Sequence, residues 1–249
     1  MSSLKSIIDY CDSLLQVRKW KDYCPNGLQV EGRDVVRRIV SGVTASQALL
    51  DRAVDLEADL ILVHHGYFWR GEDPCVTGIK RQRLQTLLQH NVSLLAYHLP
   101  LDAHPELGNN AQLAQLLGMQ VEGVLNKDGV GCYGCLATAQ PVNAFLAQIE
   151  SRLGRSPMLV SGGDHSIKTL AWCSGAAQNY IHQAADLGVD AYLSGEISEQ
   201  TVHIARERGI HYIAAGHHAT ERYGVQALGA HLAETFQLEH HYIEIDNPV

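Results

Sequence analysis

The sequence lacks several features that would place it in common functional classes. No apolar run is long enough to span a membrane, since the longest strong one, Leu60 to Val63, has the length of a short strand. Positive charge is in deficit, with 19 Lys and Arg against 27 Asp and Glu, and the net charge of −8 argues against broad binding to nucleic acid or an anionic membrane. A phosphate-binding loop of the Walker type is also absent.

The first residues do not form the apolar stretch of a secretion signal, so we expect a cytoplasmic protein with its 6 cysteines reduced. Hydrophobic residues make up 46% of the 249, which excludes disorder as the main state. The length allows one large domain or two small ones. The 14 histidines are unusual enough to justify a search for a metal site.

Strand-like apolar runs alternate with segments of helical spacing along most of the chain. The predicted strands are 35–40, 59–63, 92–97, 169–173, 191–194 and 211–215. The predicted helices are 7–17, 46–56, 81–89, 110–117, 144–153, 178–187 and 199–208. This alternation predicts parallel sheets, in which function sits beyond the carboxyl ends of the strands.

The two halves of the chain align with each other. Residues 39–65 fall on 170–196 at an offset of 131, with Asp59 on Asp190 among the identities. A second block, at an offset of 119, pairs side chains of metal-binding type: His98 with His217, and Asp102 with Glu221. A general likeness among α/β chains could explain the first block alone, but the paired residues favour a duplication.

The predicted fold class is therefore α/β, as duplicated three-layer α/β/α repeats with mostly parallel mixed sheets. We expect a first repeat over 1–123, a second over 124–236 and a C-terminal strand in 237–249, with a metal site between the repeats. The best turn signal between the halves is Asn126 to Gly129.

Residues that bind metals or protons follow four of the predicted strands. They are His64, His65, His98, Asp102, Glu196, His217 and Glu221. Three of these histidines and two of these carboxylates already exceed what one catalytic zinc with an open position needs. They suit two metal ions with a bridging carboxylate, the arrangement of many hydrolases, and this donor set favours Zn, Mn, Fe, Co or Ni.

Local spacing sets conditions on this site. His217 and Glu221 share one helix face if a helix begins after Gly216. His64 and His65 would point to opposite faces of a regular strand, so they share a site only if the chain leaves the strand there. Taken alone, each pair is more often an ordinary polar feature than a ligand pair.

Other polar residues have competing interpretations. Glu196 is either a general base or partner of a ligand histidine, or a carboxylate at a helix start. His98 is expected to line the cavity and to assist with protons. Asn109 and Asn110 are expected to cap a helix. Cys132 and Cys135 form a lone CxxC without a second ligand pair, which argues against structural zinc.

At these residues the sequence resembles the Ngg-interacting-factor-like family, whose bacterial members are named GTP cyclohydrolase 1 type 2 homologs, and it is most similar to the YbgI-type branch. The likeness covers essentially the whole chain. The matching segments are Pro25–Val30, Val63–Trp69, His98–Asp102, Gly108–Asn110, Ser194–Glu196 and Gly216–Glu221. Gly66 and Tyr67 depart from the Pro-Leu that follows the paired histidines in many members.

The resemblance implies two divalent metal ions per chain. The positions that match the family's ligands are His64, His65, Asp102, His217 and Glu221, with Glu221 as the bridging carboxylate. It also implies two intertwined subdomains related by a pseudo-dyad, and a toroidal homohexamer.

Two functions are compatible with these expectations. The first is a metal-dependent hydrolase that acts on a nucleotide or a related small phosphate compound through a metal-bridging hydroxide, with Glu196 or His98 assisting proton transfer. The alternative is a non-catalytic, metal-dependent oligomeric scaffold or regulatory binding protein.

Overall fold

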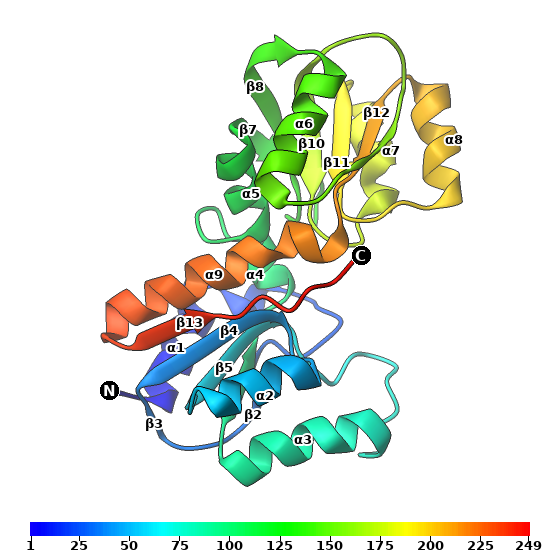
Figure 1. Ribbon diagram of the computed structural model, residues 1–249. Helices are drawn as coiled ribbons and strands as arrows, with labels where there is room; N and C mark the ends of the chain where they lie inside the picture. The colour runs from blue at the N-terminus through cyan, green and yellow to red at the C-terminus, as the bar shows by residue number, and fades with distance from the viewer. The chain divides into compact units, whose positions relative to one another are not determined.

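The computed structural model describes residues 1–249 and divides the chain into two compact units (Figure 1). The first comprises Met1–Leu101 and Gly224–Asp246, and the second Asp102–Tyr223 and Asn247–Val249. Two boundaries fall inside helices, in α4 (Leu99–Ala103) and α9 (His217–Phe236). None of the helices combines the length and the apolar character needed to cross a bilayer.

The first unit contains a five-stranded sheet in the order β13-β4-β5-β6-β2. Its strands are β2 (Gly27–Val30), β4 (Arg38–Thr44), β5 (Leu60–His65), β6 (Ser93–Ala96) and β13 (Glu239–Tyr242), and a short ribbon joins β1 (Ser2–Ser3) to β3 (Val35–Val36). Its helices are α1 (Leu4–Leu14), the 3₁₀ turn η1 (Val17–Lys19), α2 (Gln47–Asp55) and α3 (Gly78–His90). Only β2 runs antiparallel to its neighbour.

Helices cover both faces of this sheet. On one face, α2 and α3 bury an apolar cluster against the sheet (Figure 1). On the other, α1 packs beside the part of α9 that belongs to this unit, and the Tyr10 hydroxyl lies 2.6 Å from Nε2 of His231. Strands β5 and β6 are buried on both faces, and most of their residues, Leu60–Val63 and Leu94–Ala96, form apolar runs that are typical of interior parallel strands.

The second unit contains a six-stranded sheet in the order β7-β8-β10-β11-β12-β9. Its strands are β7 (Met119–Val124), β8 (Cys132–Gln140), β9 (Met158–Val160), β10 (Ile167–Cys173), β11 (Ala191–Ser194) and β12 (His211–Ala214). Its helices are α5 (Asn109–Leu117), α6 (Val142–Leu153), the 3₁₀ turn η2 (Gln178–Tyr180), α7 (Ile181–Asp186) and α8 (Glu199–Arg208). Strands β10 to β12 are parallel, and the outer strands are antiparallel to their neighbours.

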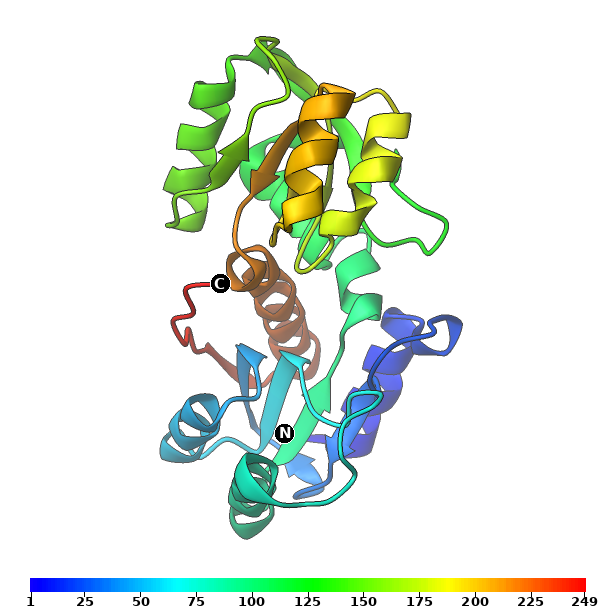
Figure 2. The ribbon, with the colours of Figure 1, turned by 90° about the vertical axis from the view of Figure 1, so that its right-hand side faces the viewer.

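This unit also has three layers. Helices α5 and α6 enclose a core with Phe145, Ile149 and Trp172 on one face of the sheet. Helices α7 and α8 lie side by side on the other face (Figure 2). Helix α5 ends where Gly118 adopts φ of +64°, as its sequence predicts, because glycine enters the left-handed region without strain.

The two units share one strand plan, which confirms the duplication. The order β4-β5-β6-β2 in one matches β10-β11-β12-β9 in the other. A detail of hydrogen bonding repeats as well. Asp59 Oδ2 accepts from the backbone N–H groups of Arg37 and Arg38, at 2.7 and 3.1 Å. Asp190 Oδ2 accepts from Lys168 and Thr169, at 2.9 and 2.8 Å.

The compact units are divided at different residues from the predicted repeats, 1–123 and 124–236. Helix α5 and strand β7 pack with the second sheet, because β7 pairs with β8. The repeat boundaries stay a prediction about the duplication. Strand β13 lies in the segment 237–249, where a C-terminal strand is expected.

Candidate metal centre

Three histidines gather at the carboxyl end of the first unit's sheet. His64 and His65 are the last residues of β5, and His98 follows β6. The ring centroids of His64 lie 4.6 Å from those of His65 and 5.0 Å from those of His98. One ring nitrogen from each lies within 4.8 Å of the others. Clustered imidazoles of this kind suit Zn, Cu, Fe and Ni.

The chain leaves β5 directly after this pair, at Gly66, which meets the condition that the sequence set. Strand β5 continues through His65, which still pairs with Thr44 of β4. Pairing with β6, however, stops at Val63 and Ala96. Beyond Val63, β5 has no partner on the β6 side, and the rings of His64 and His65 both lie beside that of His98, with centroids 5.0 and 5.7 Å from it.

Each of the three rings has a hydrogen-bonding partner at Nδ1 within the first unit. His64 Nδ1 donates to the carbonyl oxygen of Tyr97 at 2.9 Å, because that oxygen only accepts. His65 Nδ1 lies 3.3 Å from the Thr44 hydroxyl. His98 Nδ1 lies 2.7 Å from Oδ1 of Asp22. Fixing Nδ1 in this way orients the rings and directs Nε2 toward bound groups.

The second unit holds Asp102, His217 and Glu221. Helix α9 begins at His217, directly after Gly216 as predicted, so His217 and Glu221 lie one turn apart, with Nε2 and Oε2 separated by 3.1 Å. One oxygen of Asp102 lies within 4.8 Å of one of Glu221. These carboxylates are only 5% and 3% exposed. Buried carboxylates this close repel each other unless a cation or a proton offsets their charge.

The carboxylate of Asp102 is held by two side chains that the sequence did not single out for this role. Asn109 Nδ2 donates to Asp102 Oδ1 at 2.9 Å, and Ser174 Oγ donates to the same oxygen at 3.0 Å. The expected capping role of Asn109 and Asn110 is wrong, because Gly108 is the N-cap of α5. Asn110 instead accepts from the backbone N–H of Ser174 at 2.9 Å.

Glu196 orients His217. Its Oε1 lies 2.7 Å from Nδ1 of His217, so the imidazole stands between Glu196 and Glu221. Burial lowers the pKa of His217, but hydrogen bonds and charge from the two glutamates outweigh it and raise the pKa to about 9. Helix α8 is capped by Ser198 instead, so the helix-start interpretation of Glu196 is wrong.

The aromatic residues after the paired histidines pack within the first unit. Tyr67 is buried, and its hydroxyl donates to the carbonyl oxygen of Ala45 at 2.7 Å. The Trp69 ring meets the His98 ring edge-on, with centroids 5.1 Å apart. Tyr67 therefore belongs to the core, while Trp69 forms a wall beside the histidines.

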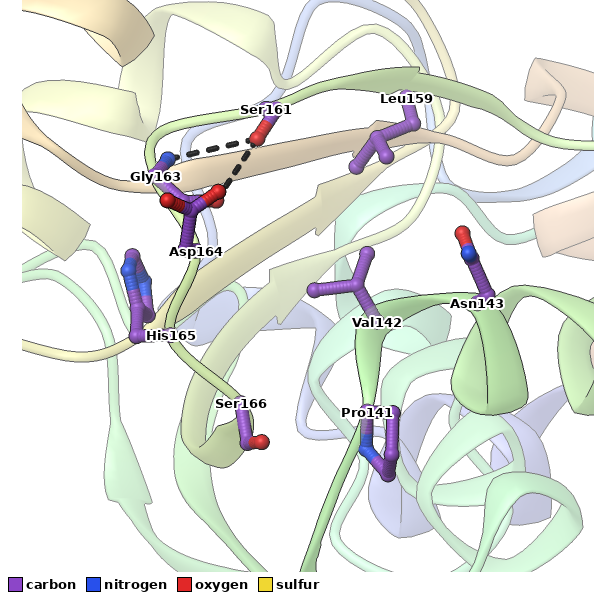
Figure 3. A pocket seen from close by; sticks show the side chains of 9 residues that line it. All are labelled: Pro141, Val142, Asn143, Leu159, Ser161, Gly163, Asp164, His165 and Ser166. Carbon is purple, nitrogen blue, oxygen red and sulfur yellow. Dashed lines mark hydrogen bonds between the residues drawn. The ribbon is translucent and has the colours of Figure 1, made fainter.

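A cavity in the second unit contains none of the predicted ligands (Figure 3). It has a volume of about 280 Å³ and lies between the start of α6 and the loop that joins β9 to β10. Within that loop, Ser161 and Gly163 are hydrogen-bonded to each other, with Ser161 Oγ donating to the Gly163 carbonyl at 2.9 Å. Cys132 and Cys135 lie on strand β8, where neither opens a helix as a redox CxxC would.

The predicted ligands are thus divided between the units. His64 and His65 belong to the first, and Asp102, His217 and Glu221 to the second. Of the two predicted catalytic residues, His98 lies with the histidines of the first unit, and Glu196 contacts His217 in the second. The first cluster offers three imidazoles, and the second offers one imidazole and two carboxylates; both are donor types of divalent metal sites.

These features define a duplicated α/β protein with residue groups suited to metal binding. The family model described as Duf34/NIF3 (NGG1p interacting factor 3) matches residues 2–248, and the chain belongs to this family. A Pseudomonas aeruginosa protein named GTP cyclohydrolase 1 type 2 homolog is 59% identical over 249 residues, covering 99% of this chain and 98% of the relative.

Solved structures agree with the fold. One described as protein ybgI, of unknown function, has a TM-score of 0.96 and 50% identity and covers 99% of this chain and 100% of its own. The structure of TTHA1606 from Thermus thermophilus has a TM-score of 0.92 and 33% identity, with coverage of 99% and 100%. The predicted family and the α/β fold class are confirmed.

Proposed function

We propose that this protein is a metal-dependent hydrolase that acts on a nucleotide or a related small phosphate compound. In this proposal, two divalent ions would be held by His64, His65, Asp102, His217 and Glu221. Zn, Mn, Fe, Co and Ni all suit this donor set. Two ions bound there would activate water as a nucleophile and polarise the bond to be cleaved.

The observation that carries the proposal is the arrangement around His217. Its Nδ1 is held by Glu196 at 2.7 Å, and its Nε2 faces Glu221 at 3.1 Å. A carboxylate that orients an imidazole through Nδ1 is the usual support of a metal-binding histidine. The buried Asp102, fixed by Asn109 and Ser174, adds a second oriented carboxylate to the same unit.

The backbone beside Glu221 also fits a ligand site. A Cβ atom at Gly175 would lie 2.1 Å from Glu221 Oε1 and 3.3 Å from His217 Nε2. Only glycine therefore leaves room for the carboxylate where it lies. The sequence places no side chain where the ligand atoms converge.

The protein's own residues have distinct parts in the proposed reaction. Glu196 is a positioning residue, since it acts on His217. His98 offers an imidazole beside His64 and His65, where a substrate or water would bind, and is the candidate for moving a proton. GTP is the first substrate to try, because the Pseudomonas aeruginosa relative carries the name GTP cyclohydrolase 1 type 2 homolog.

The test compares metal content and turnover in two double variants. His217→Ala with Glu221→Ala removes an imidazole and a carboxylate four residues apart on α9. His203→Ala with Glu207→Ala removes the same pair of side chains, at the same spacing, from an exposed face of α8. Protein purified without added metal or chelator is analysed by elemental mass spectrometry and then screened with GTP and other nucleotides.

We expect about two ions per chain in the wild type and the α8 control, and a loss of metal and turnover in the α9 variant. No bound transition metal in the wild type, even after addition of Mn, Zn, Fe, Co or Ni, contradicts the proposal. Bound metal without turnover of any nucleotide, together with dissociation on metal removal, points to the scaffold instead.

The proposal extends to assembly and location. A toroidal homohexamer, which the family resemblance implies, predicts six times the 27.3 kDa chain mass in light scattering. A cytoplasmic location accords with six cysteines that are free thiols in the structure. A monomer in light scattering would remove the assembly from the proposal without touching the metal site.

A further inference from the structure

His98 is held more firmly than a residue that merely lines a cavity. Its backbone N–H donates to Asn26 Oδ1 at 2.7 Å, and its Nδ1 contacts Asp22 Oδ1 at 2.7 Å. The Trp69 ring packs edge-on against it. All these contacts lie within the first unit. They fix both the position of the ring and the direction in which it faces.

The surroundings of Asp22 determine which nitrogen of His98 carries the proton. Asp22 Oδ1 also accepts from the Tyr23 backbone N–H at 2.6 Å. Its Oδ2 accepts from Asn26 Nδ2 at 2.8 Å and from the Leu99 backbone N–H at 3.0 Å. The carboxylate, 3% exposed, therefore accepts from three other donors, as an ionised group does. An ionised carboxylate only accepts, so Nδ1 of His98 must donate.

We propose that Asp22 is a positioning residue that holds His98 in the Nδ1–H tautomer and leaves the Nε2 lone pair to accept a hydrogen bond beside His64 and His65. The group it accepts from is an O–H or N–H donor, either water or a substrate hydroxyl or amine. The inference rests on the proposed function, because it deepens the description of that same site.

The second repeat supports this assignment independently. His217 is the residue aligned with His98, and it too has a carboxylate on Nδ1, that of Glu196 at 2.7 Å. The opposite nitrogen of His217 faces Glu221, a predicted ligand. In both repeats, Nδ1 of the histidine contacts a carboxylate that fixes the ring, and Nε2 is the nitrogen that faces the candidate site. The two carboxylates, Asp22 and Glu196, occupy positions that do not align between the repeats, so the same contact to Nδ1 is made by different segments of the chain.

Asp22→Asn tests the tautomer directly. Asp22 Oδ2 accepts from two groups that can only donate there, Asn26 Nδ2 and the Leu99 N–H, whereas Oδ1 accepts from one such group, the Tyr23 N–H, and from His98, whose imidazole can change tautomer. The amide oxygen of the new side chain therefore belongs at the Oδ2 position. Its NH₂ group then faces His98 and donates to Nδ1, which moves the imidazole proton to Nε2. Asp9→Asn, at an exposed position on α1 of the same unit, is the matched control.

The readout is nitrogen-15 magic-angle-spinning NMR of the histidine-labelled, sedimented full chain, with and without Zn²⁺, at pH 9. This pH lies well above the ordinary pKa of an imidazole. The signals of His98 are identified by their loss in His98→Gln. We expect the Nδ1–H tautomer in the wild type and in Asp9→Asn, and mainly Nε2–H in Asp22→Asn.

Zinc content and kinetics give a second readout. If GTP turnover is found, Asp22→Asn should lower kcat about 10- to 100-fold, while bound zinc per chain stays unchanged. An Nε2–H wild type, an unchanged tautomer in Asp22→Asn, or a loss of zinc in that variant would overturn the inference. If Asp22→Asn fails to fold, the wild-type tautomer still decides.

Failure of the proposed function is distinguishable from failure of this inference. A wild type that binds no metal but shows Nδ1–H at His98, reversed in Asp22→Asn, refutes the hydrolase and supports the positioning role. A wild type that binds two ions but shows Nε2–H at His98 supports the metal site of the proposed function and refutes the positioning role of Asp22.

Discussion

Gly175→Ala should weaken zinc binding by displacing Glu221, an effect that a matched glycine variant can distinguish from a loss of fold stability. Gly175 has φ of +67°, and the added Cβ would lie 2.1 Å from Glu221 Oε1, whereas ordinary contacts begin near 3.4 Å. The carboxylate must therefore move by about 1 Å or more. Metal–ligand distances hold to within about 0.2 Å, so a shift of this size removes Glu221 as a ligand.

Gly188→Ala is the matched control, since Gly188 has φ of +70° and no atom within 4 Å of the added Cβ. Both variants should lose about 1–2 kcal/mol through the left-handed backbone conformation. Gly175→Ala should lose about 1.5–3 kcal/mol more, because Glu221 leaves His217. Only Gly175→Ala should weaken zinc binding, by at least about tenfold, which corresponds to 1.4 kcal/mol.

The assays are urea unfolding of the metal-free proteins and zinc titration against a chromophoric chelator. Equal zinc affinity in the two variants would refute the placement of Glu221 at the metal site. Equal stability with unequal affinity would instead show that the carboxylate moves without cost to the fold. That result would revise only the energetic part of the reasoning.

Three further predictions concern the second unit. In metal-free protein, the pKa of His217 is raised from its ordinary value of 6.5 to about 9, so the protonated imidazole stabilises the fold by up to about 3 kcal/mol at pH values below 6.5. This contribution is lost as the pH rises through 9. Urea unfolding at pH 6, 8 and 9.5 should therefore show a decreasing free energy of unfolding in the wild type, and His217→Gln should remove that decrease. Asn109→Ala frees Asp102 and should weaken zinc binding about 10- to 100-fold in the same titration, whereas the exposed Asn143→Ala should not. Chelation should lower the Tm of the wild type, measured by calorimetry, and leave that of the His217→Ala, Glu221→Ala variant unchanged, because only a bound ion adds to stability through mass action.

The parts of the fold that depend on local signals were predictable. Strand β11 and helix α8 occupy the predicted residues, 191–194 and 199–208. An apolar run buried on both faces marks an interior strand, and a glycine at the C-cap marks a helix end. Such signals lie within a few residues of the element they define.

The edge strands other than β13 escaped prediction for the converse reason. Strands β2, β7 and β9 are partly exposed, and β2 and β9 pair with strands distant in the sequence. Strand β9, for example, pairs with β12 across some fifty residues. Pairing of that kind leaves little pattern in the strand itself.

The site divides along the same line. His217 and Glu221 could be predicted because a helix brings them together. The partners that hold the site residues could not, since Asp22 lies 76 residues from His98, and Asn109 reaches Asp102 instead of capping α5.

The duplication explains why aligning the two halves of the sequence identifies the residues that set the strand positions but not the residues that orient the histidines. Asp59 and Asp190 keep the same backbone contacts in both repeats, because strand position depends on them. The position aligned with Glu196 is His65, so the first repeat has no carboxylate there and takes one from Asp22 instead. Any acceptor that reaches Nδ1 orients an imidazole equally well, whichever segment supplies it. Orienting groups are therefore free to change segment after a duplication, while groups that set the backbone frame are not.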